Sequence, residues 1–570
     1  MNILAEYLQS FFSSLGPFII LLGLLIFVHE LGHFLVAKFF GVRVEVFSLG
    51  FGKKIAQFVK GDTTYCLSLI PLGGYVKMYG DDPTKTVPES EQKFAFLCKP
   101  VSQRIAIVLA GPLMNFFFAA FLFTMIGLLG QKVPDSSIGD VAVGSAAYEA
   151  GFRSGDRVLS VSGTAVQTWK EFSTILEDSG KVNLNITVER EGETDRPSIS
   201  VTPTLIQNPN VLSLKEWIGD IEGIQVTSKA PIFGISNPQS LAGSFGFPKV
   251  TLITSINGEK ITYLREVGPR LLSLYKKQEN AEITFKSYDY DEKKDSEEKT
   301  LAITTNEWQA LSSNNYDNGN ALLKAIGFHD SQLVLLVIKE GSPADKAGLL
   351  KGDRLVSLNQ KDLSSWDEVV ETVKQYKKDS GPVEFIVERD GQEQKLNIVP
   401  EMTELLNNQG QDDHRFTVGI VPALAMVTGP HTLIQFSNPF KALSFGFERT
   451  LEWSKLVAVS FVRLFQRKVS TKNIGGIITI GKVAGESFRA GLDRYLTMMA
   501  IISINLFLLN LLPIPILDGG HLVFFSIEAL RGAPLSLRKM EIAQQIGLVL
   551  LISLMAMSLF NDISNLLSPW

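Results

Sequence analysis

Two histidines and a glutamate lie within an apolar stretch near the N-terminus. Residues 18–40 contain His29, Glu30 and His33 in the pattern H-E-x-x-H. On a helix, positions i and i+4 share one face, so the two imidazoles can bind one metal ion. Glu30 lies beside them, where it can take a proton from an attacking water. The spacing therefore indicates a zinc hydrolase site with Glu30 as its base.

A plainer interpretation of the motif is available. H-E-x-x-H is short enough to arise by chance, and the histidines would then be core residues hydrogen-bonded to neighbouring helices. Against this, ionisable side chains inside an apolar span are energetically costly and are usually kept for function. This cost favours the metal site.

A catalytic zinc site needs a third protein ligand and leaves one position for water. Residues 510–521, NLLPIPILDGGH, supply the candidate Asp518 at the end of an uncharged stretch. Pro513 and Pro515 predict a helix break, which lets this segment turn toward a polar cavity. Helix capping is the alternative role for Asp518. His521 is a rival ligand that ranks below it.

Four stretches are apolar enough to cross a bilayer, which requires about 20 such residues. They are residues 8–27, 105–130, 498–517 and 542–560. The metal motif follows the first stretch at its inner end, and Asp518 falls at the inner end of the third. The ligands can therefore meet at one depth of the membrane. Because the N-terminus lacks a basic region and a cleavage site, we expect the first stretch to be retained and not removed as a signal peptide.

Lysine and arginine concentrate in two loops, residues 38–104 and 531–539. The positive-inside rule places both loops in the cytoplasm. We therefore expect the N-terminus, the large middle region and the C-terminus on the outer side. Cys66 and Cys98 then lie in the reducing compartment. The net charge of −5 and the lack of a basic patch argue against a nucleic-acid partner.

The first inner loop has the pattern of a β-hairpin. Residues 42–59 and 63–78 are strand-like and are separated by a turn at Gly61-Asp62. Gly73 and Gly74 would let another backbone approach closely, so the second strand is a candidate edge for an added peptide strand. An ordinary hairpin is the alternative, which the residues by themselves favour.

The polar middle region, about residues 134–400, contains a repeat. Residues 145–158, SAAYEAGFRSGDRV, return as residues 342–355, SPADKAGLLKGDRL. Each copy continues through a strand, a tryptophan, a helix and a strand ending in V-E-R-x-G. A fainter copy begins at Pro238 and lacks the Gly-Asp of the turn. The spacing of about 100 residues predicts one small β-rich domain per copy.

The two strong copies resemble PDZ domains, which bind an extended peptide end along a sheet edge. A spacer role is the alternative for each copy, and we prefer it for the faint one. Residues 289–299 are expected to form a solvated hairpin tip, and residues 407–413 a polar linker. Further on, Phe440, Leu443, Phe447 and Leu451 recur at helical spacing. This spacing predicts a helix on the membrane surface or one packed on a PDZ domain.

The expected fold is an α-helical membrane protein with four transmembrane helices and inserted β-rich PDZ domains, an α+β architecture. The expected parts are residues 1–133 (first membrane half), 134–205 (PDZ-like), 206–330 (degenerate PDZ-like or spacer), 331–401 (PDZ), 402–494 (linker and surface helices) and 495–570 (second membrane half).

H-E-L-G-H in a first span and N-x-x-P-x-P-x-L-D-G-G in a later one resemble the site-2 protease family. The match also takes in residues 111–115, GPLMN, and residues 71–78, PLGGYVKM, so it covers both membrane halves. The third PDZ-like copy departs from the usual two. The resemblance implies Zn²⁺ held by His29, His33 and Asp518, with Glu30 as general base.

The resemblance further implies how the substrate is held. Asn505 and Asn510 would contact it, and the hairpin at Gly73, Gly74 and Tyr75 would pair with it as an added strand. Its implied activity is intramembrane cleavage of single-span proteins such as anti-sigma factors, or of signal-peptide remnants, in a bacterial inner membrane. The PDZ domains would screen substrates on the periplasmic side.

Two other functions are consistent with parts of the sequence. A membrane adaptor would present PDZ domains and use the metal structurally, but the intact Glu30 argues against it. A zinc transporter would use paired histidines in a span, yet it would need neither Glu30 at that spacing nor peptide-binding modules.

Overall fold

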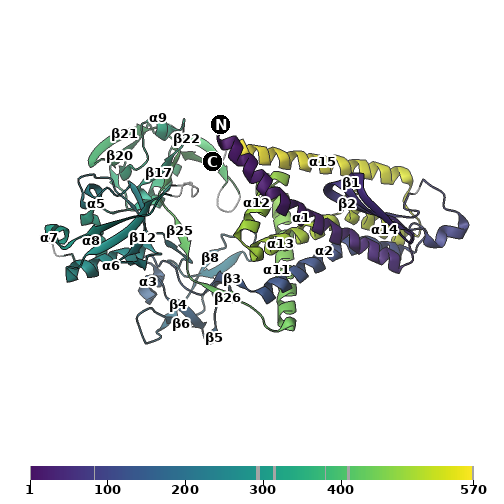
Figure 1. The fold of residues 1–570 in the computed structure, drawn as a ribbon, viewed down its shortest axis with the longest axis horizontal. Coiled ribbons are helices and arrows are strands. Elements are labelled where there is room, and N and C mark those ends of the chain that lie inside the picture. The colour runs from purple at the N-terminus through teal and green to yellow at the C-terminus, as the bar shows by residue number, and fades with distance from the viewer. Residues whose placement is uncertain are drawn as a thin grey trace.

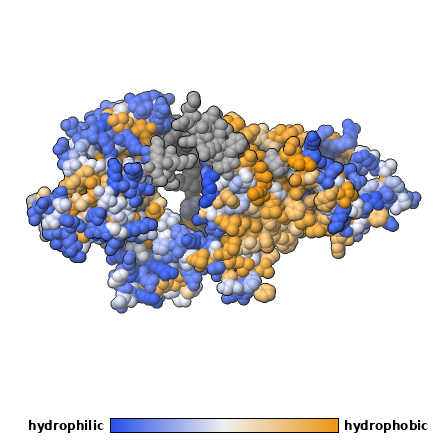
Figure 2. All heavy atoms as spheres, in the orientation of Figure 1, coloured by the Kyte–Doolittle hydropathy of each residue, from blue (hydrophilic) through white to orange (hydrophobic). Residues whose placement is uncertain are grey.

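The computed structural model describes residues 2–82, 84–289, 296–311, 316–378, 380–406 and 411–567. Long helices form one part of the molecule, and β-rich units form the other (Figure 1). Hydrophobic side chains cover the helices in a broad belt, whereas the β-rich units and the opposite end of the molecule are largely hydrophilic (Figure 2). This distribution is typical of a protein that crosses a bilayer.

Four helices in the described part of the chain are long and apolar enough to span a membrane, as the sequence predicts. They are α1 (Asn2–Phe39), α2 (Val101–Leu129), α13 (Leu492–Leu511) and α15 (Leu537–Leu567). Several boundaries differ from expectation, and two of them bear on the metal motif and Asp518. The first candidate span, Leu15–Phe39, contains the metal motif instead of ending before it. The third helix ends at Leu511, before Pro513, because the two prolines cannot continue it.

Helices α1 and α2 approach each other closely beside the metal motif. A Cβ atom at Gly32 of α1 would lie 2.3 Å from the Ala110 carbonyl oxygen of α2. Further along, Leu21 and Leu25 of α1 are fully buried with Ile126 of α2. Small residues at one level and large apolar ones at another therefore set the crossing of these helices.

The first inner loop forms the expected hairpin from β1 (Val44–Lys60) and β2 (Thr63–Met78). The first half of β1 pairs on both of its sides, since Val46 lies opposite both Thr64 and Lys77. Residues 74–78 are therefore the outer strand of this small sheet. Their inner side pairs with β1 through Ser48–Tyr75 and Leu49–Gly74.

The repeated middle region forms three units with one strand order. The two strong copies give four-stranded sheets of order β5-β4-β6-β7 and β19-β18-β20-β21. The faint copy contains the same order, β13-β12-β14-β15, and adds β11 (Ile232–Gly234) and β16 (His329–Asp330). The first unit contains α3 (Ala146–Ala150), β4 (Arg157–Val161), β5 (Thr164–Ala165), α4 (Trp169–Asp178), β6 (Leu184–Glu189) and β7 (Ser198–Val201). The faint unit contains α5 (Leu241–Ser244), β12 (Val250–Ile256), β13 (Glu259–Lys260), α6 (Leu264–Lys277), β14 (Ala281–Ser287) and β15 (Lys299–Ile303). The last unit contains α9 (Pro343–Lys346), β18 (Arg354–Leu358), β19 (Lys361–Asp362), α10 (Trp366–Lys374), β20 (Val383–Arg389) and β21 (Gln392–Ile398).

A buried ion pair explains two of the repeated motifs. Asp156 of the first Gly-Asp turn is paired with Arg190, and Asp353 of the second is paired with Arg389. Both aspartates are almost fully buried, so each needs the guanidinium of the V-E-R strand end. The faint copy lacks the Asp and the Arg together.

Two hairpins straddle the expected domain boundaries. The expected boundary after residue 205 falls inside β8 (Thr204–Gln207), which pairs with β9 (Trp217–Asp220). The expected boundary after residue 401 falls inside β22 (Glu401–Leu406), which pairs with β23 (Asp412–Thr417). The predicted linker at 407–413 is therefore wrong at its end, where Asp412 and Asp413 are strand residues. Residues 407–410, like residues 290–295 of the expected hairpin tip, lie outside the described residues.

Helix α11 (Pro439–Phe465) lies across α2 in Figure 1. Its small residues Ala442, Gly446 and Thr450 are buried, and a Cβ atom at Gly446 would be 2.5 Å from the Ala120 carbonyl oxygen of α2. The predicted apolar stripe is divided: Phe440, Leu443 and Leu451 are exposed, with Phe440 82% exposed. The ring of Phe447 instead packs against Phe116 and Phe117 of α2. The helix therefore packs on α2 through its small residues and Phe447, and not on a β-rich unit through the stripe.

Candidate metal centre

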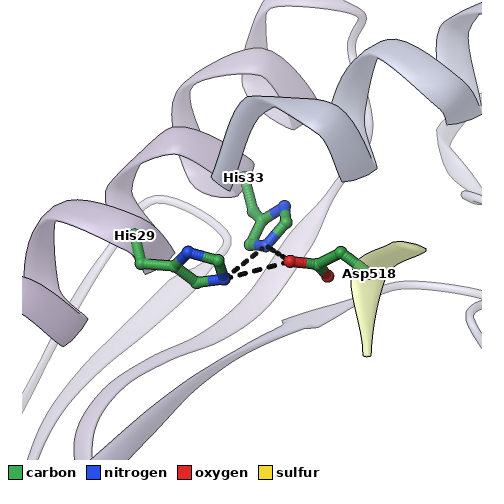
Figure 3. Close-up of side chains that lie close together, drawn as sticks. All are labelled: His29, His33 and Asp518. Carbon is green, nitrogen blue, oxygen red and sulfur yellow. Dashed lines mark hydrogen bonds and ion pairs between the residues drawn. The ribbon is translucent and has the colours of Figure 1, made fainter. Parts of the chain in front are cut away.

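Two helices that are far apart in the sequence bring together three side chains of the types that bind metal ions. His29 and His33 extend from α1, and Asp518 is the first residue of α14 (Asp518–Arg531) (Figure 3). The Oδ2 atom of Asp518 is 3.1 Å from Nε2 of His29 and 3.5 Å from Nε2 of His33. The two Nε2 atoms are 3.3 Å apart. All three ligand atoms therefore face one point.

The proline and glycine pairs around Asp518 explain its position. Pro513 and Pro515 lie in the break between α13 and α14. A Cβ atom at Gly519 would be 2.2 Å from the Leu512 carbonyl oxygen, and one at Gly520 would be 2.4 Å from that of Ile514. Only glycine lets α14 begin so close to the chain that precedes it. The L-D-G-G sequence thus directs the carboxylate toward α1.

Neighbouring polar groups orient both imidazoles. His33 donates from Nδ1 to the Ile107 carbonyl oxygen of α2 at 2.9 Å, which leaves the lone pair of Nε2 facing Asp518. Nδ1 of His29 is 3.3 Å from the side-chain amide nitrogen of Asn115, which is fully buried. The amide oxygen of Asn115 has no partner among the described residues. If the amide is turned over, this oxygen accepts a hydrogen bond from the N–H at Nδ1 of His29.

This set of donors fits a zinc ion. With both Nδ1 atoms protonated, the two Nε2 lone pairs and the Asp518 carboxylate are all acceptors. Oδ2 of Asp518 is buried and has no hydrogen-bond donor in the described part of the chain. Such a group of acceptors is costly without a cation between them. Two imidazoles and one carboxylate are a ligand set of catalytic zinc, which leaves a position open.

Glu30 lies beside the three ligands on the wall of a cavity of about 1170 Å³. His29, His33 and Asp518 also line this cavity. Val76, in the outer strand of the hairpin, lines the cavity together with Glu30, and its backbone N–H faces the Glu30 carboxylate. Further lining residues come from the inner loop and from α15, including Asp81, Lys85, Gln92, Glu541 and Gln544. Because polar side chains line much of the cavity, water can reach Glu30.

The structure brings only part of the expected substrate-binding set to this cavity. Tyr75 lines it. A Cβ atom at Gly74 would be 3.2 Å from Cγ of Glu30, so the backbone approach that Gly74 permits is to the protein's own helix α1. Gly73 has a φ of +153° and lies under the ring of Phe51.

Asn505, Asn510 and His521, which the sequence also singles out, lie outside the group formed by His29, His33 and Asp518. Asn505 and Asn510 are half-buried on α13, and neither is among the lining residues. His521 lines the cavity but lies outside the three-residue ligand group, with its ring against Phe524 and Phe525. Asp518 therefore meets the histidines and His521 does not. The Ile107 carbonyl carries no sequence signal, whereas Asn115 belongs to the G-P-L-M-N motif.

Comparison with known proteins agrees with this geometry. The profile of peptidase family M50 matches residues 17–554, a range that contains both histidines and Asp518. The regulator of sigma-E protease RseP of Escherichia coli K12 is 30% identical over 559 residues, which are 98% of this chain and 100% of that protein. A regulator of sigma E protease of Haemophilus influenzae is 30% identical over 560 residues, again 98% and 100%. A Pasteurella multocida protein named as a zinc metalloprotease is 31% identical over the same shares. The resemblance to the site-2 proteases is thus confirmed, and the chain belongs to peptidase family M50.

Proposed function

We propose that the protein is a zinc-dependent intramembrane endopeptidase, which cleaves transmembrane segments of single-span proteins in regulated intramembrane proteolysis. The observation that carries this proposal is the convergence of His29, His33 and Asp518 within and beside an apolar helix. Family membership supports peptidase chemistry, and the name of the Pasteurella relative supports zinc.

The residues around the ligands suit peptide hydrolysis. A zinc ion held there supplies a Lewis acid for a peptide carbonyl and for water. Glu30 takes the proton from the attacking water and passes it to the leaving amine. The Ile107 carbonyl and Asn115 keep the ligand nitrogens of His33 and His29 turned toward the site. The polar cavity supplies water that a bilayer interior lacks.

The outer strand at residues 74–78 is suited to hold the substrate. A peptide bond in a transmembrane helix is hydrogen-bonded, so the segment must unwind before attack. We propose that the unwound segment pairs with this edge of β2, at Gly73, Gly74 and Tyr75. The contact between Val76 and Glu30 supports this, because it places the strand beside the base. Asn505 and Asn510 of α13 complete the proposed set of substrate contacts.

We propose that the two strong β-rich units are PDZ domains that bind peptide ends. In the last unit, a groove of about 480 Å³ runs between α10 and residues 415–421. Trp366, Val369, Val370 and Val373 line one side of it. An extended peptide end fits between a helix and a strand in this way. Substrates shortened outside the membrane, such as anti-sigma factors, present such ends.

The arrangement of the chain supports a location in the bacterial inner membrane. The outer ends of α1 and α15 lie on the side of the β-rich units, and the hairpin lies at the opposite end (Figure 1). With the basic loops in the cytoplasm, the β-rich units and both termini are periplasmic.

Metal analysis of the purified full-length protein, together with cleavage of a membrane-embedded reporter, tests the proposal. We expect about one zinc per chain and cleavage that depends on Glu30. A protein that binds zinc but never cuts the reporter would instead be an adaptor. A protein without zinc would contradict the proposed chemistry.

A further inference from the structure

A buried ion pair joins α2 to α14 on the wall of the catalytic cavity. Nη2 of Arg104 is 2.6 Å from Oε1 of Glu528, and Nη1 is 3.0 Å from Oε2. A third donor of the guanidinium, Nε, donates to the Lys99 carbonyl oxygen at 3.0 Å. The Arg104 side chain is 8% exposed and that of Glu528 is 15% exposed. The guanidinium also lies over the ring of Phe525, 4.8 Å from its centre.

Each partner belongs to a helix that sets the position of a metal ligand. On α2, Arg104 lies one turn before Ile107, whose carbonyl fixes the ring of His33. On α14, Glu528 lies ten residues after Asp518, about 15 Å along the helix. Asp518 follows the break at Pro513 and Pro515. This break by itself does not hold α14 against α2. The ion pair therefore fastens the far end of the helix that begins with the third ligand.

We propose that Arg104 and Glu528 are a positioning pair, which holds α14 against α2 so that Asp518 keeps its distance from the two histidines. The inference rests on the proposed zinc site and deepens it. Metal–ligand distances tolerate deviations of only about 0.2 Å, so a small tilt of α14 about its fixed end changes metal affinity. A two-bond guanidinium–carboxylate contact restricts such a tilt because it fixes orientation as well as distance.

General stabilisation is the other role that a buried pair can have, but its expected effects differ. Replacing both partners of a buried pair by apolar side chains of similar volume is often nearly neutral for stability, whereas removing one leaves an unpaired buried charge. If the pair only stabilises the fold, the double variant should bind zinc normally. If the pair positions α14, the double variant also loses the orientation that the two bonds imposed, and zinc binding stays weak.

The experiment uses the full-length protein in detergent, loaded with zinc and then mixed with a chelator. We compare Arg104→Gln, Glu528→Gln, Arg104→Lys and the double variant Arg104→Met/Glu528→Met, in which both buried charges are replaced by apolar side chains. We expect about 10-fold faster zinc release from both single Gln variants and from the double variant, the usual effect of removing support from a metal ligand. Arg104→Lys keeps the charge but not the two-bond contact, so its release should be intermediate.

A matched control comes from the same inner region. Lys77 and Glu45 form an exposed ion pair on the hairpin, 2.6 Å apart. Lys77→Gln should release zinc at the wild-type rate. Thermal unfolding of the zinc-free proteins shows whether a variant has lost the fold. As a further readout, added zinc should restore reporter cleavage to Arg104→Gln but not to Glu30→Gln.

The outcomes separate this inference from the proposed function. Wild-type release rates in the double variant, or faster release that tracks the loss of zinc-free stability, would overturn the positioning role. If the wild type and every pair variant hold zinc while Asp518→Ala does not, only the positioning role fails. If the wild type takes up no zinc, the metal centre and the pair's role fail together.

Discussion

His33 of α1 is bonded to the Ile107 carbonyl of α2, with 2.9 Å between Nδ1 and the carbonyl oxygen. This hydrogen bond from a second helix sets the tautomer of a candidate metal ligand. Pro112 follows in the next turn of α2, where its missing N–H and its ring disturb the regular backbone bonding. The second span therefore contributes to the metal centre without supplying a ligand, which explains why the first two spans pack so closely at this level.

Replacing Glu30 by Gln should abolish cleavage while zinc binding persists. The amide has nearly the same size but cannot accept the proton of the attacking water, so we expect a loss of about 10²- to 10⁴-fold in kcat/KM. Glu45→Gln, at a half-buried position of β1 that pairs with Lys77, should leave cleavage unchanged. Cleavage and zinc content are measured on the same preparations. Cleavage by Glu30→Gln at the wild-type rate would assign the base to another residue.

Replacing Asp518 by Ala should remove most of the bound zinc, because two imidazoles alone form an incomplete site. His521→Ala provides the comparison, since His521 lines the same cavity but lies outside the ligand group. We expect the His521 variant to keep its zinc. Zinc analysis after dialysis distinguishes the two variants. The opposite result, with zinc lost only from the His521 variant, would exchange their roles.

The parts of the centre that the sequence predicts are those fixed by local geometry. His29 and His33 share a helix face because they are four residues apart, whatever else the fold does. Asp518 could be singled out because two prolines and two glycines mark a break at that point of an apolar stretch. The occurrence of three small β-rich units likewise follows from one pattern that is repeated along the chain, whereas their strand order comes from the structure alone.

The parts that could not be predicted depend on contacts between distant segments. A backbone carbonyl such as that of Ile107 has no side-chain signature. The helix through the metal motif continues to Phe39 because residues 34–39 are apolar apart from Lys38, so hydropathy alone does not locate its inner end. For α11, the large residues suggested the packing face, but close approach to α2 requires the small ones at Gly446 and Thr450.

Replacing Gly111 by Ala should disrupt the metal centre, although the change adds only a methyl group. A Cβ atom there would lie 2.2 Å from Nε2 of His33, so the ligand ring must move. We expect at least about 10-fold weaker zinc binding and a matching loss of cleavage. Gly23→Ala in α1 is the control, because no heavy atom lies within 4 Å of its added Cβ. Normal zinc affinity in Gly111→Ala would contradict the close packing of α2 on His33.

Placing a charge in the groove of the last β-rich unit should weaken peptide binding without affecting the metal centre. Val370 is half-buried on α10 and lines the groove, so Val370→Glu puts a carboxylate where an apolar side chain and a peptide carboxylate would lie. Lys374→Glu introduces the same charge on the exposed part of α10, outside the groove lining. A fluorescent peptide with a free apolar C-terminal residue is titrated onto each full-length variant, with its amide as comparison. We expect about 10-fold weaker binding for Val370→Glu only, because an unpaired charge in an apolar groove is costly. Equal binding by both variants, with unchanged zinc content, would show that peptide ends do not dock in this groove.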